Sequence, residues 1–204
     1  MKVKLLEVRT SVRQQNSISS QLSSLFVDAW RLHHPNVQHI VRDVGANCPA
    51  MPDDFWVKAN YTLPDERTQE MINCLAPSDA LIDEFLGADY IVLAVPMYNL
   101  SVPANFKAYI DNIVRVGRTF AFNRETFTLS GLATGKKSLL ITPSAATPSP
   151  ETDFCEPYVR AVLRFIGVEE MECVKVPNQF MPSDIRSLSI EGAEAKLLEL
   201  AKTW

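Results

Sequence analysis

Short apolar runs of strand length alternate with longer segments of helical periodicity, and this alternation constrains the fold of the chain more than any other feature. The strand-like runs cover residues 3–8, 37–44, 90–95, 137–142 and 171–176. The helical patterns cover residues 17–34, 67–87, 103–116, a segment that ends at 166, and 184–202. Such alternation predicts βαβ units and therefore a mainly parallel sheet with helices on both faces. Five strands in 204 residues favour one doubly wound domain that spans residues 1–204.

Some segments depart from this regular pattern. Residues 45–66 carry three prolines and three large aromatic side chains, so we expect an irregular excursion, which in a compact domain usually has a function or packs on a partner. Residues 119–129 form an aromatic connection between elements. Pro77 is expected to interrupt the helical segment around it. Asp111 and Arg115 lie four positions apart, which predicts an ion pair within one helix.

The composition excludes several classes of protein. A hydrophobic content of 47% and a charged content of 22% are typical of a soluble globular protein. The formal net charge of -4 gives no general attraction to nucleic acid or to an anionic membrane. The apolar run in the first eight residues is too short for a signal peptide or a membrane span. The four cysteines contain no Cys-x-x-Cys pair, so we expect a cytoplasmic protein with reduced thiols.

Ligands of doubly wound sheets bind beyond the carboxyl ends of the strands, which here are residues 9–17, 96–101 and 143–153. The first of these loops is rich in hydroxyl groups and leads into a helix, whose free N–H groups and dipole favour an anion. Its polar residues are Thr10, Ser11, Asn16, Ser17, Ser19 and Ser20. The alternative is that Ser17 only caps the helix, and the loop alone does not separate the two interpretations.

The second loop is unusually apolar and reads AVPMYNLSVP from Ala94 to Pro103. Turns that face water favour Gly, Asn, Asp and Ser, so a turn that contains Met97, Tyr98 and Leu100 suggests a flat apolar ligand. Packing of Met97 and Tyr98 beneath a helix is the alternative interpretation.

The sequence lacks the motifs of the common catalytic classes. The first loop matches neither G-x-G-x-x-G nor G-x-x-x-x-G-K-[ST], and the chain has no Cys-x5-Arg loop and no Gly-x-Ser-x-Gly elbow. His33, His34 and His39 lie near what should be the opposite edge of the sheet and are interpreted as surface residues. A site without a reactive side chain commonly uses a cofactor, and an aromatic heterocycle with a phosphate tail, such as FMN, fits the two loops.

The apolar turn also carries a family resemblance. Residues 96–103, PMYNLSVP, are followed by NFKAYIDNIVRVGRTF. This combination closely resembles the FMN-dependent azoreductases and NADH:quinone oxidoreductases of flavodoxin-like fold, in which Pro-Met-Tyr-Asn-Phe precedes a helix that ends in Gly-Lys-Thr-Phe. Leu100 stands where that family commonly has Phe. The resemblance covers nearly the whole chain, including residues 11–19, GLATGKK and PYVRAVLRFIG.

The resemblance implies a flavodoxin-like, doubly wound, five-stranded parallel sheet of order 2-1-3-4-5 that binds FMN. The phosphate is expected at Ser11, Ser17, Ile18 and Ser19. The ring is expected against Pro96, Met97, Tyr98, Asn99 and Leu100, with Pro143, Ser144, Ala145 and Ala146 at its pyrimidine edge. The family usually has Ser-Arg-Gly-Gly in this last loop. Alanine adds a methyl group and disfavours positive φ, so flavin affinity or ring tilt is expected to differ here.

The implied activity is the two-electron reduction of quinones, and of azo or nitroaromatic compounds, in a ping-pong cycle with NADH or NADPH as the donor. Candidates for the substrate walls are Tyr98, Phe120, Phe122 and Phe127, and the alternative for each of them is a place in the core. The resemblance also implies a homodimer in which each pocket is completed by the other subunit. Two alternatives stay open, a one-electron carrier like flavodoxin and a binding module that has lost its flavin.

Overall fold

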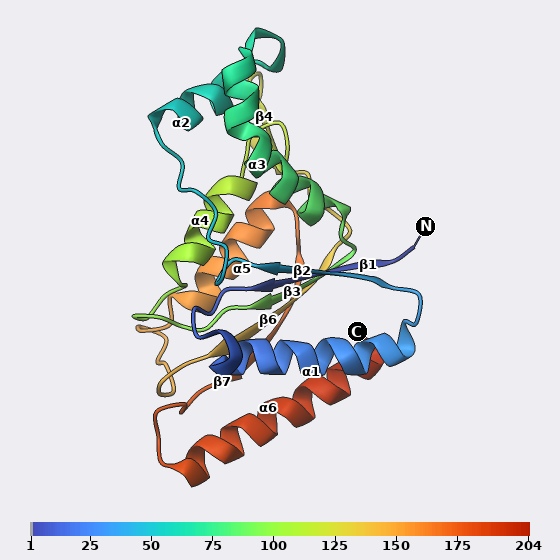
Figure 1. The fold of residues 1–204 in the computed structure, drawn as a ribbon, viewed down its shortest axis with the longest axis vertical. Helices are drawn as coiled ribbons and strands as arrows, with labels where there is room; N and C mark the ends of the chain where they lie inside the picture. Colours follow the sequence, from blue (N-terminus) through green and yellow to red (C-terminus); the bar gives the residue numbers. More distant parts are fainter. Residues whose placement is uncertain (1) are drawn as a thin grey trace.

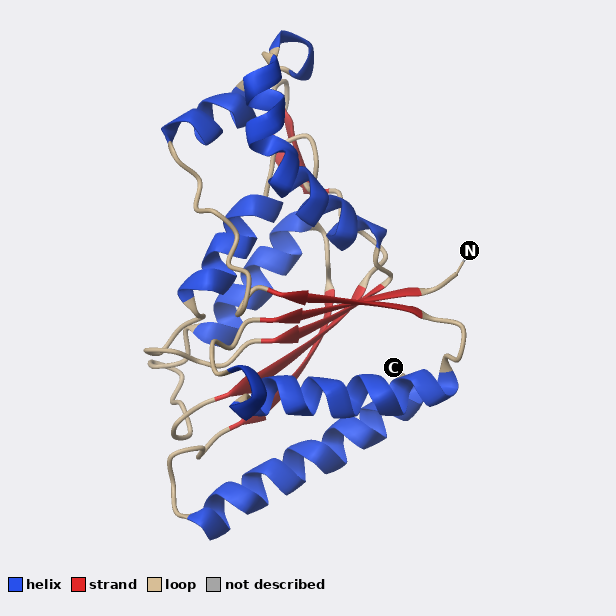
Figure 2. Cartoon of the chain, in the orientation of Figure 1, coloured by secondary structure: helices blue, strands red, loops and turns tan. Residues whose placement is uncertain are grey.

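A computed structural model describes residues 2–204 of the chain. Within these residues the central element is a five-stranded parallel sheet of order β2-β1-β3-β6-β7, whose strands are the red arrows in Figure 2. The strands are β1 (Lys4–Arg9), β2 (Gln38–Asp43), β3 (Tyr90–Ala94), β6 (Lys137–Pro143) and β7 (Glu170–Val176). Counted along the chain within this sheet, the order is 2-1-3-4-5, so the predicted topology is confirmed.

Helices cover both faces of the sheet (Figure 1). On one face lie α1 (Ile18–His33) and α6 (Ser183–Thr203), and on the other lie α3 (Gln69–Gly87), α4 (Ala104–Ile113) and α5 (Cys155–Ile166). Successive side chains of a strand point to opposite faces, so Leu5 packs with Trp30 of α1 while Leu6 belongs to the opposite core with Phe85 of α3. The two cores are therefore separated by the sheet itself.

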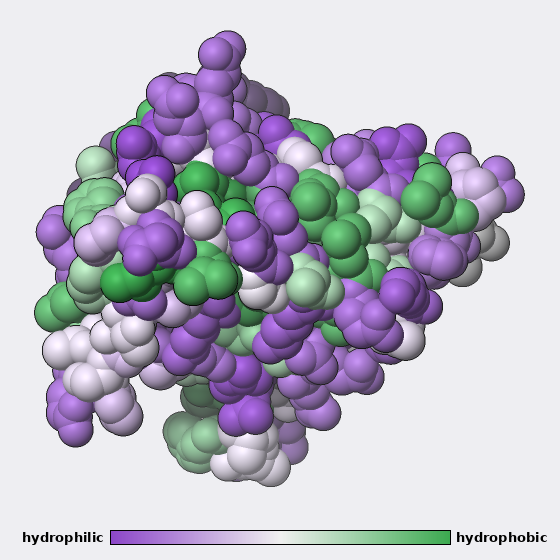
Figure 3. All heavy atoms as spheres, turned by 90° about the horizontal axis from the view of Figure 1, so that it is seen from below, coloured by the Kyte–Doolittle hydropathy of each residue, from purple (hydrophilic) through white to green (hydrophobic). Residues whose placement is uncertain are grey.

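The outer surface of α1 and α6 is mostly hydrophilic, with hydrophobic side chains scattered between the polar ones (Figure 3). The exposed large apolar side chains of these two helices are Leu32, Ile185, Leu188 and Leu198. Within residues 2–204, no helix is long and apolar enough to cross a membrane.

A separate projection rises from the sheet at the top of Figure 1. It contains α2 (Asp54–Tyr61), the first turns of α3, and a hairpin formed by β4 (Phe120–Asn123) and β5 (Thr128–Gly131). We call it the arm. The segment 45–66, expected to be irregular, thus includes a helix, and residues 119–129 include two short strands. Asp53 accounts for the helix, because its carboxylate accepts a hydrogen bond from Trp56 N (2.7 Å) and caps α2.

Two local predictions about the helices are wrong. α3 continues through Pro77, although a proline removes one N–H donor from the helix, and residues on both sides of it, such as Leu75 and Leu81, are buried. Asp111 pairs with Lys107 (Oδ1 to Nζ, 2.5 Å), and Arg115 pairs with Asp79 of α3 (2.8 Å). Asp111 therefore pairs with a different residue of α4, whereas Arg115, which lies just after the helix, binds α3.

Arg115 holds the arm together from the inside, and its side chain is only 1% exposed. Its Nε donates to Asn60 Oδ1 of α2 (2.9 Å), and its Nη1 donates to Ser78 Oγ (3.0 Å) and Asp79 Oδ1 (2.8 Å) of α3. The guanidinium carbon also lies 5.6 Å from the centre of the Trp56 ring. Burial lowers the pKa of Arg115, and the nearby Asp79 carboxylate opposes this shift.

Candidate functional site

A pocket of about 620 Å³ opens beyond the carboxyl ends of β1, β3 and β6. Pockets of this size typically hold small-molecule ligands or cofactors. Its wall contains every residue that the sequence analysis assigns to the cofactor. These are Ser11, Ser17, Ile18, Ser19, Pro96, Met97, Tyr98, Asn99, Leu100, Pro143, Ser144, Ala145 and Ala146. The three strand-end loops therefore meet at one site, and the role of each residue there stays a prediction.

Ser17 and Ser19 form a polar end of the pocket at the start of α1. Ser17 Oγ accepts a hydrogen bond from Ser20 N (3.2 Å), which makes Ser17 the N-cap, and it lies 3.1 Å from Ser19 Oγ. Both serines are buried, at 2% and 1% exposure. The two hydroxyl groups carry two protons and the bond between them uses one, so the other proton has no acceptor among the described residues. The pair can therefore donate to an oxygen atom of a ligand.

The first turn of α1 adds backbone donors to the same end. Ser20 N donates to Ser17 Oγ and Gln21 N donates to Ser17 O (3.0 Å). The N–H groups of Ile18 and Ser19 have no acceptor within residues 2–204, and the first turn carries no acidic side chain. Unpaired N–H groups and the positive end of the helix dipole both favour an anion at this position.

Hydrogen bonds fix the serine loop beside the aromatic turn. Thr10 Oγ1 donates to Ala94 O (3.0 Å), and Asn105 Nδ2 donates to Thr10 O (2.8 Å). Ser11 Oγ lies 3.4 Å from the hydroxyl group of Tyr98. These hydrogen bonds therefore hold the serine loop and the aromatic turn in fixed positions relative to each other.

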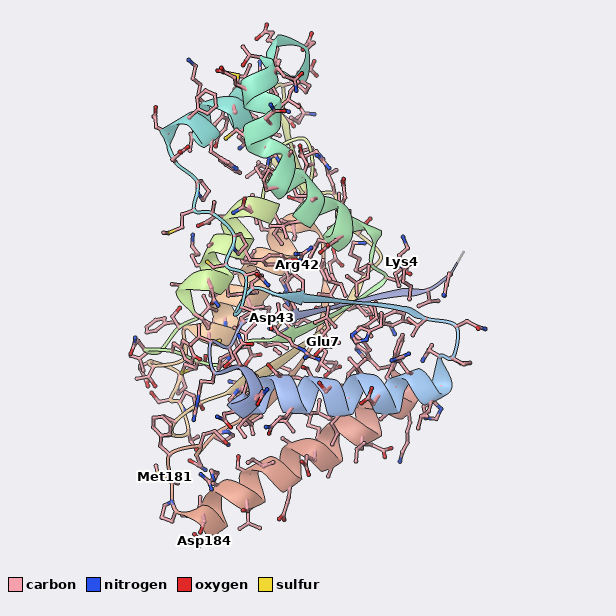
Figure 4. All side chains as sticks on the ribbon, viewed as in Figure 1. Lys4, Glu7, Arg42, Asp43, Met181 and Asp184 are labelled. Carbon is pink, nitrogen blue, oxygen red and sulfur yellow. The ribbon has the colours of Figure 1, made fainter. Side chains whose placement is uncertain are left out.

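Glu7 anchors α1 to the sheet behind this loop. It lies on β1 and points toward α1 (Figure 4), where it accepts a hydrogen bond from Ser23 Oγ (2.5 Å). Arg9 Nε (2.8 Å) and His39 Nε2 (2.9 Å) also bind its carboxylate. Burial raises the pKa of Glu7, but the hydrogen bonds from His39, Arg9 and Ser23 outweigh burial and hold the pKa below its ordinary value. Glu7 is therefore ionised at neutral pH although its side chain is fully buried.

The turn at residues 98–101 has a strained backbone. Asn99 and Leu100 have positive φ angles of 48° and 71°. Tyr98 N donates to Ser101 O (2.8 Å) and Ser101 N donates to Tyr98 O (3.1 Å), which is a two-residue turn with the φ signs of type I′. Such turns prefer glycine at the position of Leu100, and a leucine there costs on the order of 1 kcal/mol. Strain of this kind concentrates at binding sites, and here it lies in the pocket wall.

The third loop, residues 143–153, forms hydrogen bonds with the segment that joins β7 to α6. Gln179 N donates to Ser144 O (3.0 Å), and Phe180 N donates to Ala145 O (3.1 Å). These bonds bring Gln179 and Phe180 into the pocket wall. Met181, labelled in Figure 4, follows them just before α6 begins.

Several residues of the pocket wall lie outside the sequence-based assignment. They are Arg13, Asn16, Thr147, Pro148, Thr152, Gln179 and Phe180. The first five lie in loops 9–17 and 143–153, which the strand-end rule already names. Gln179 and Phe180 follow the predicted strand 171–176, so the same rule applied to that strand would have included them. Phe180 is 80% exposed, which leaves its ring available at the pocket.

Of the four residues predicted to form the substrate walls, one lies at the pocket and three lie elsewhere. Tyr98 lines the pocket, whereas Phe120, Phe122 and Phe127 lie in the hairpin of the arm and outside the pocket wall of the described residues. Phe120 packs against Phe165, with ring centres 4.8 Å apart, and Phe122 lies 6.3 Å from Phe127. Their assignment as substrate walls therefore stays a prediction.

The pocket offers binding groups rather than a nucleophile with a base. Arg13 is the one side chain of its described wall that carries a formal charge at neutral pH. Cys155, beside Thr142 of β6, is fully buried, and burial raises the pKa of its thiol to about 11. Among residues 2–204, no group of three His, Cys, Asp or Glu side chains is placed to hold a metal ion. The arrangement suits a ligand with an anionic tail and an apolar body.

The sheet order and a pocket at the carboxyl edge together define a flavodoxin-like protein. A family model described as flavodoxin-like fold matches residues 3–200. An FMN-dependent NADH:quinone oxidoreductase from Nostoc punctiforme is 37% identical and covers 99% of this chain and 100% of its own. An enzyme of the same description from Trichormus variabilis is 40% identical and covers 99% of this chain and 97% of its own.

Solved structures share the fold. An azoreductase from Bacillus anthracis matches with a TM-score of 0.89 and 24% identity, over 99% of this chain and 100% of its own. An FMN-dependent NADH-azoreductase from the same species, in complex with FMN, matches with a TM-score of 0.86 and 20% identity, over 98% of both chains. This chain belongs to the FMN-dependent NADH:quinone oxidoreductase family of the flavodoxin-like fold, as the resemblance predicts.

Proposed function

We propose that this chain is an FMN-dependent NAD(P)H oxidoreductase that reduces quinones, and also azo and nitroaromatic compounds. Its curated relatives are named for FMN, NADH and quinone, and they align with it from end to end. The observation that carries the proposal is the composition of the pocket, with hydroxyl and N–H donors at the α1 end and the apolar turn of Met97, Tyr98 and Leu100 in the wall after β3. FMN has the same division between a phosphate and a flat ring.

Each part of the pocket has a role in this proposal. The hydroxyl groups of Ser11, Ser17 and Ser19 and the N–H of Ile18 bind the phosphate, and residues 96–100 lie against the ring. Residues 143–146 face the pyrimidine edge. Bound FMN supplies the redox chemistry, because it accepts a hydride from NADH or NADPH and passes two electrons to the acceptor. The protein positions the flavin and its substrates, supplies hydrogen-bond donors near the ring, and excludes water from the pocket.

Ala145 and Ala146 fit this assignment despite the missing glycines. Among the described residues, the non-glycine residues with positive φ are Gln14, Asn99, Leu100, Phe127 and Asn178, so neither alanine needs a glycine-like conformation. Ser144 Oγ donates to Ala146 O (2.8 Å) and holds the loop in this form. The loop therefore adopts its conformation without glycine, and alanine at both positions carries no backbone strain.

We further propose that the protein works as a cytoplasmic homodimer in which a second copy covers the pocket. The four cysteines are free thiols, in keeping with a reducing compartment. The arm exposes several large apolar side chains, and a surface of this kind favours contact with a partner. Its exposed large apolar side chains include Phe55, Val57, Tyr61, Ile72, Phe122, Phe127 and Leu129. A partner subunit on this surface would also bring hairpin phenylalanines to a neighbouring pocket.

Replacing Phe127 with glutamate is expected to shift the protein from dimer to monomer at micromolar concentration, because the charge would be buried at the interface. Leu32→Glu is the matched control, since Leu32 is 81% exposed and Phe127 is 80% exposed, but Leu32 lies on α1. Light scattering measures both variants. A wild-type protein that is monomeric and fully active at micromolar concentration would exclude the dimer.

Quinones are expected to turn over faster than azo dyes. No carboxylic acid, histidine or lysine is present in the described pocket wall to protonate an azo nitrogen, and azo cleavage needs two hydride cycles. Steady-state NADH oxidation with a panel of benzoquinones and azo dyes measures this order. The FMN-free protein serves as the control, and equal rates with and without FMN would contradict the proposed function. An azo dye that outpaces every quinone would contradict the expected preference.

A further inference from the structure

We infer that Arg13 binds the phosphate of FMN and makes the pocket select FMN over riboflavin, the same ring system without a phosphate. This inference rests on the proposed function. Its first support is the charge distribution of the pocket. Within the described wall, Arg13 is the one side chain with a formal charge at neutral pH, and every other wall residue is neutral. A carboxylate that would compete for the guanidinium is therefore missing from this part of the pocket.

Main-chain contacts define the position of Arg13 in the loop. It lies two residues after Ser11, and its own N–H donates to Ser11 Oγ (3.3 Å). It occupies the N-cap position of the short 3-10 helix at Gln14–Asn16, without a side-chain cap bond, and this helix leads directly to Ser17 at the start of α1. Arg13 therefore belongs to the same loop as the buried serine pair, between two fixed points of the pocket wall.

The side chain of Arg13 is free to meet a ligand. It is exposed, and its guanidinium forms no ion pair or hydrogen bond with any of residues 2–204. The other arginine of β1 and its following loop, Arg9, is already bound to Glu7 and Ser24. Arg13 is thus the cation that remains available where the loop reaches the pocket.

The chemistry of the neighbouring groups identifies the ligand as a phosphate ester. The N–H groups of Ile18 and Ser19 and the spare hydroxyl proton of the Ser17–Ser19 pair are all donors. A phosphate ester carries three acceptor oxygens and a charge of about −1.5 to −2 at pH 7. A guanidinium can bind two of these oxygens at once, in addition to the helix start. Riboflavin would leave these donors and the cation without a partner.

Replacing Arg13 with glutamine is expected to weaken FMN binding by about fivefold, the upper end for one solvent-accessible charged contact, and to change riboflavin binding by less than about twofold. The apoprotein is titrated with each flavin, and quenching of flavin fluorescence gives both dissociation constants. Arg13→Lys keeps the charge but loses the two-point contact, so its FMN affinity should be intermediate. FMN binding to wild type should also weaken more with added salt than binding to Arg13→Gln.

Arg31→Gln is the matched control, because Arg31 is an exposed arginine in the last turn of α1, at the end opposite the pocket. It should bind both flavins like wild type. An equal loss of FMN and riboflavin affinity in Arg13→Gln, or no loss of either, would overturn the inference. If Arg13 instead meets a phosphate of the nicotinamide nucleotide, the FMN to riboflavin ratio stays unchanged while NADH binding to the FMN-loaded protein weakens. A wild-type protein that binds neither flavin would contradict the proposed function itself.

Discussion

Replacing Ser17 with aspartate is expected to lower the affinity for FMN by at least about a hundredfold and to leave the apoprotein folded. Aspartate is as good an N-cap as serine, so the free energy of unfolding should stay within about 1 kcal/mol of wild type. The new carboxylate would stand where the phosphate is proposed to bind. Two like charges about 4 Å apart repel by roughly 4 kcal/mol at an effective dielectric constant near 20, and each 1.4 kcal/mol is a factor of ten in affinity.

Ser17→Ala and riboflavin are the two controls for this result. The alanine variant loses one hydrogen bond, which costs on the order of 1 kcal/mol, or about tenfold at most. Riboflavin has no phosphate, so Ser17→Asp should weaken its binding much less than it weakens that of FMN. If Ser17→Asp binds FMN as tightly as wild type, the phosphate lies elsewhere and Ser17 is only the cap of α1.

Replacing Arg115 with methionine is expected to lower the free energy of unfolding by about 3 kcal/mol. Methionine fills much of the space, but it donates nothing to Asn60 Oδ1, Ser78 Oγ or Asp79 Oδ1. The contact with the Trp56 ring is lost as well. Because these partners join α2 to α3, the arm should loosen first, and denaturant titration with hydrogen exchange of the α2 amides would measure both effects.

Arg118→Met provides the comparison for Arg115. Arg118 also binds Asp79, and it binds Asp83 at 2.6 Å, but its side chain is 33% exposed. Ion pairs of this exposure contribute about 0–1 kcal/mol, so the loss should stay below about 1 kcal/mol. Equal losses for the two variants would show that burial of Arg115 is not what stabilises the arm.

The fold was predictable because its determinants are local and repeated. Each buried strand alternates with a helix of clear periodicity, and chain connectivity then leaves few sheet orders. The pocket loops were predictable for a related reason, since the carboxyl ends of parallel strands share one edge. Neither inference needs a contact between residues that are distant in the sequence.

Some of the parts that sequence reasoning missed depend on such distant contacts. Arg115 has a carboxylate four residues before it, yet it binds Asn60 and Asp79 in other helices. Phe180 reaches the pocket because its N–H binds Ala145 O in another loop. The positive φ of Leu100 runs against the intrinsic preference of leucine, so no propensity predicts it.

Anaerobic reduction of the FMN-loaded protein by NADH tests the central proposal most directly. The flavin absorbance should bleach with one NADH per bound FMN, and a benzoquinone added afterwards should restore it. Ser17→Asp, mixed with the same concentration of FMN, should show little bleaching, because the pocket would be empty. If wild type binds FMN but neither NADH nor NADPH bleaches it, while chemical reduction does, the protein is an electron carrier and not an NAD(P)H oxidoreductase.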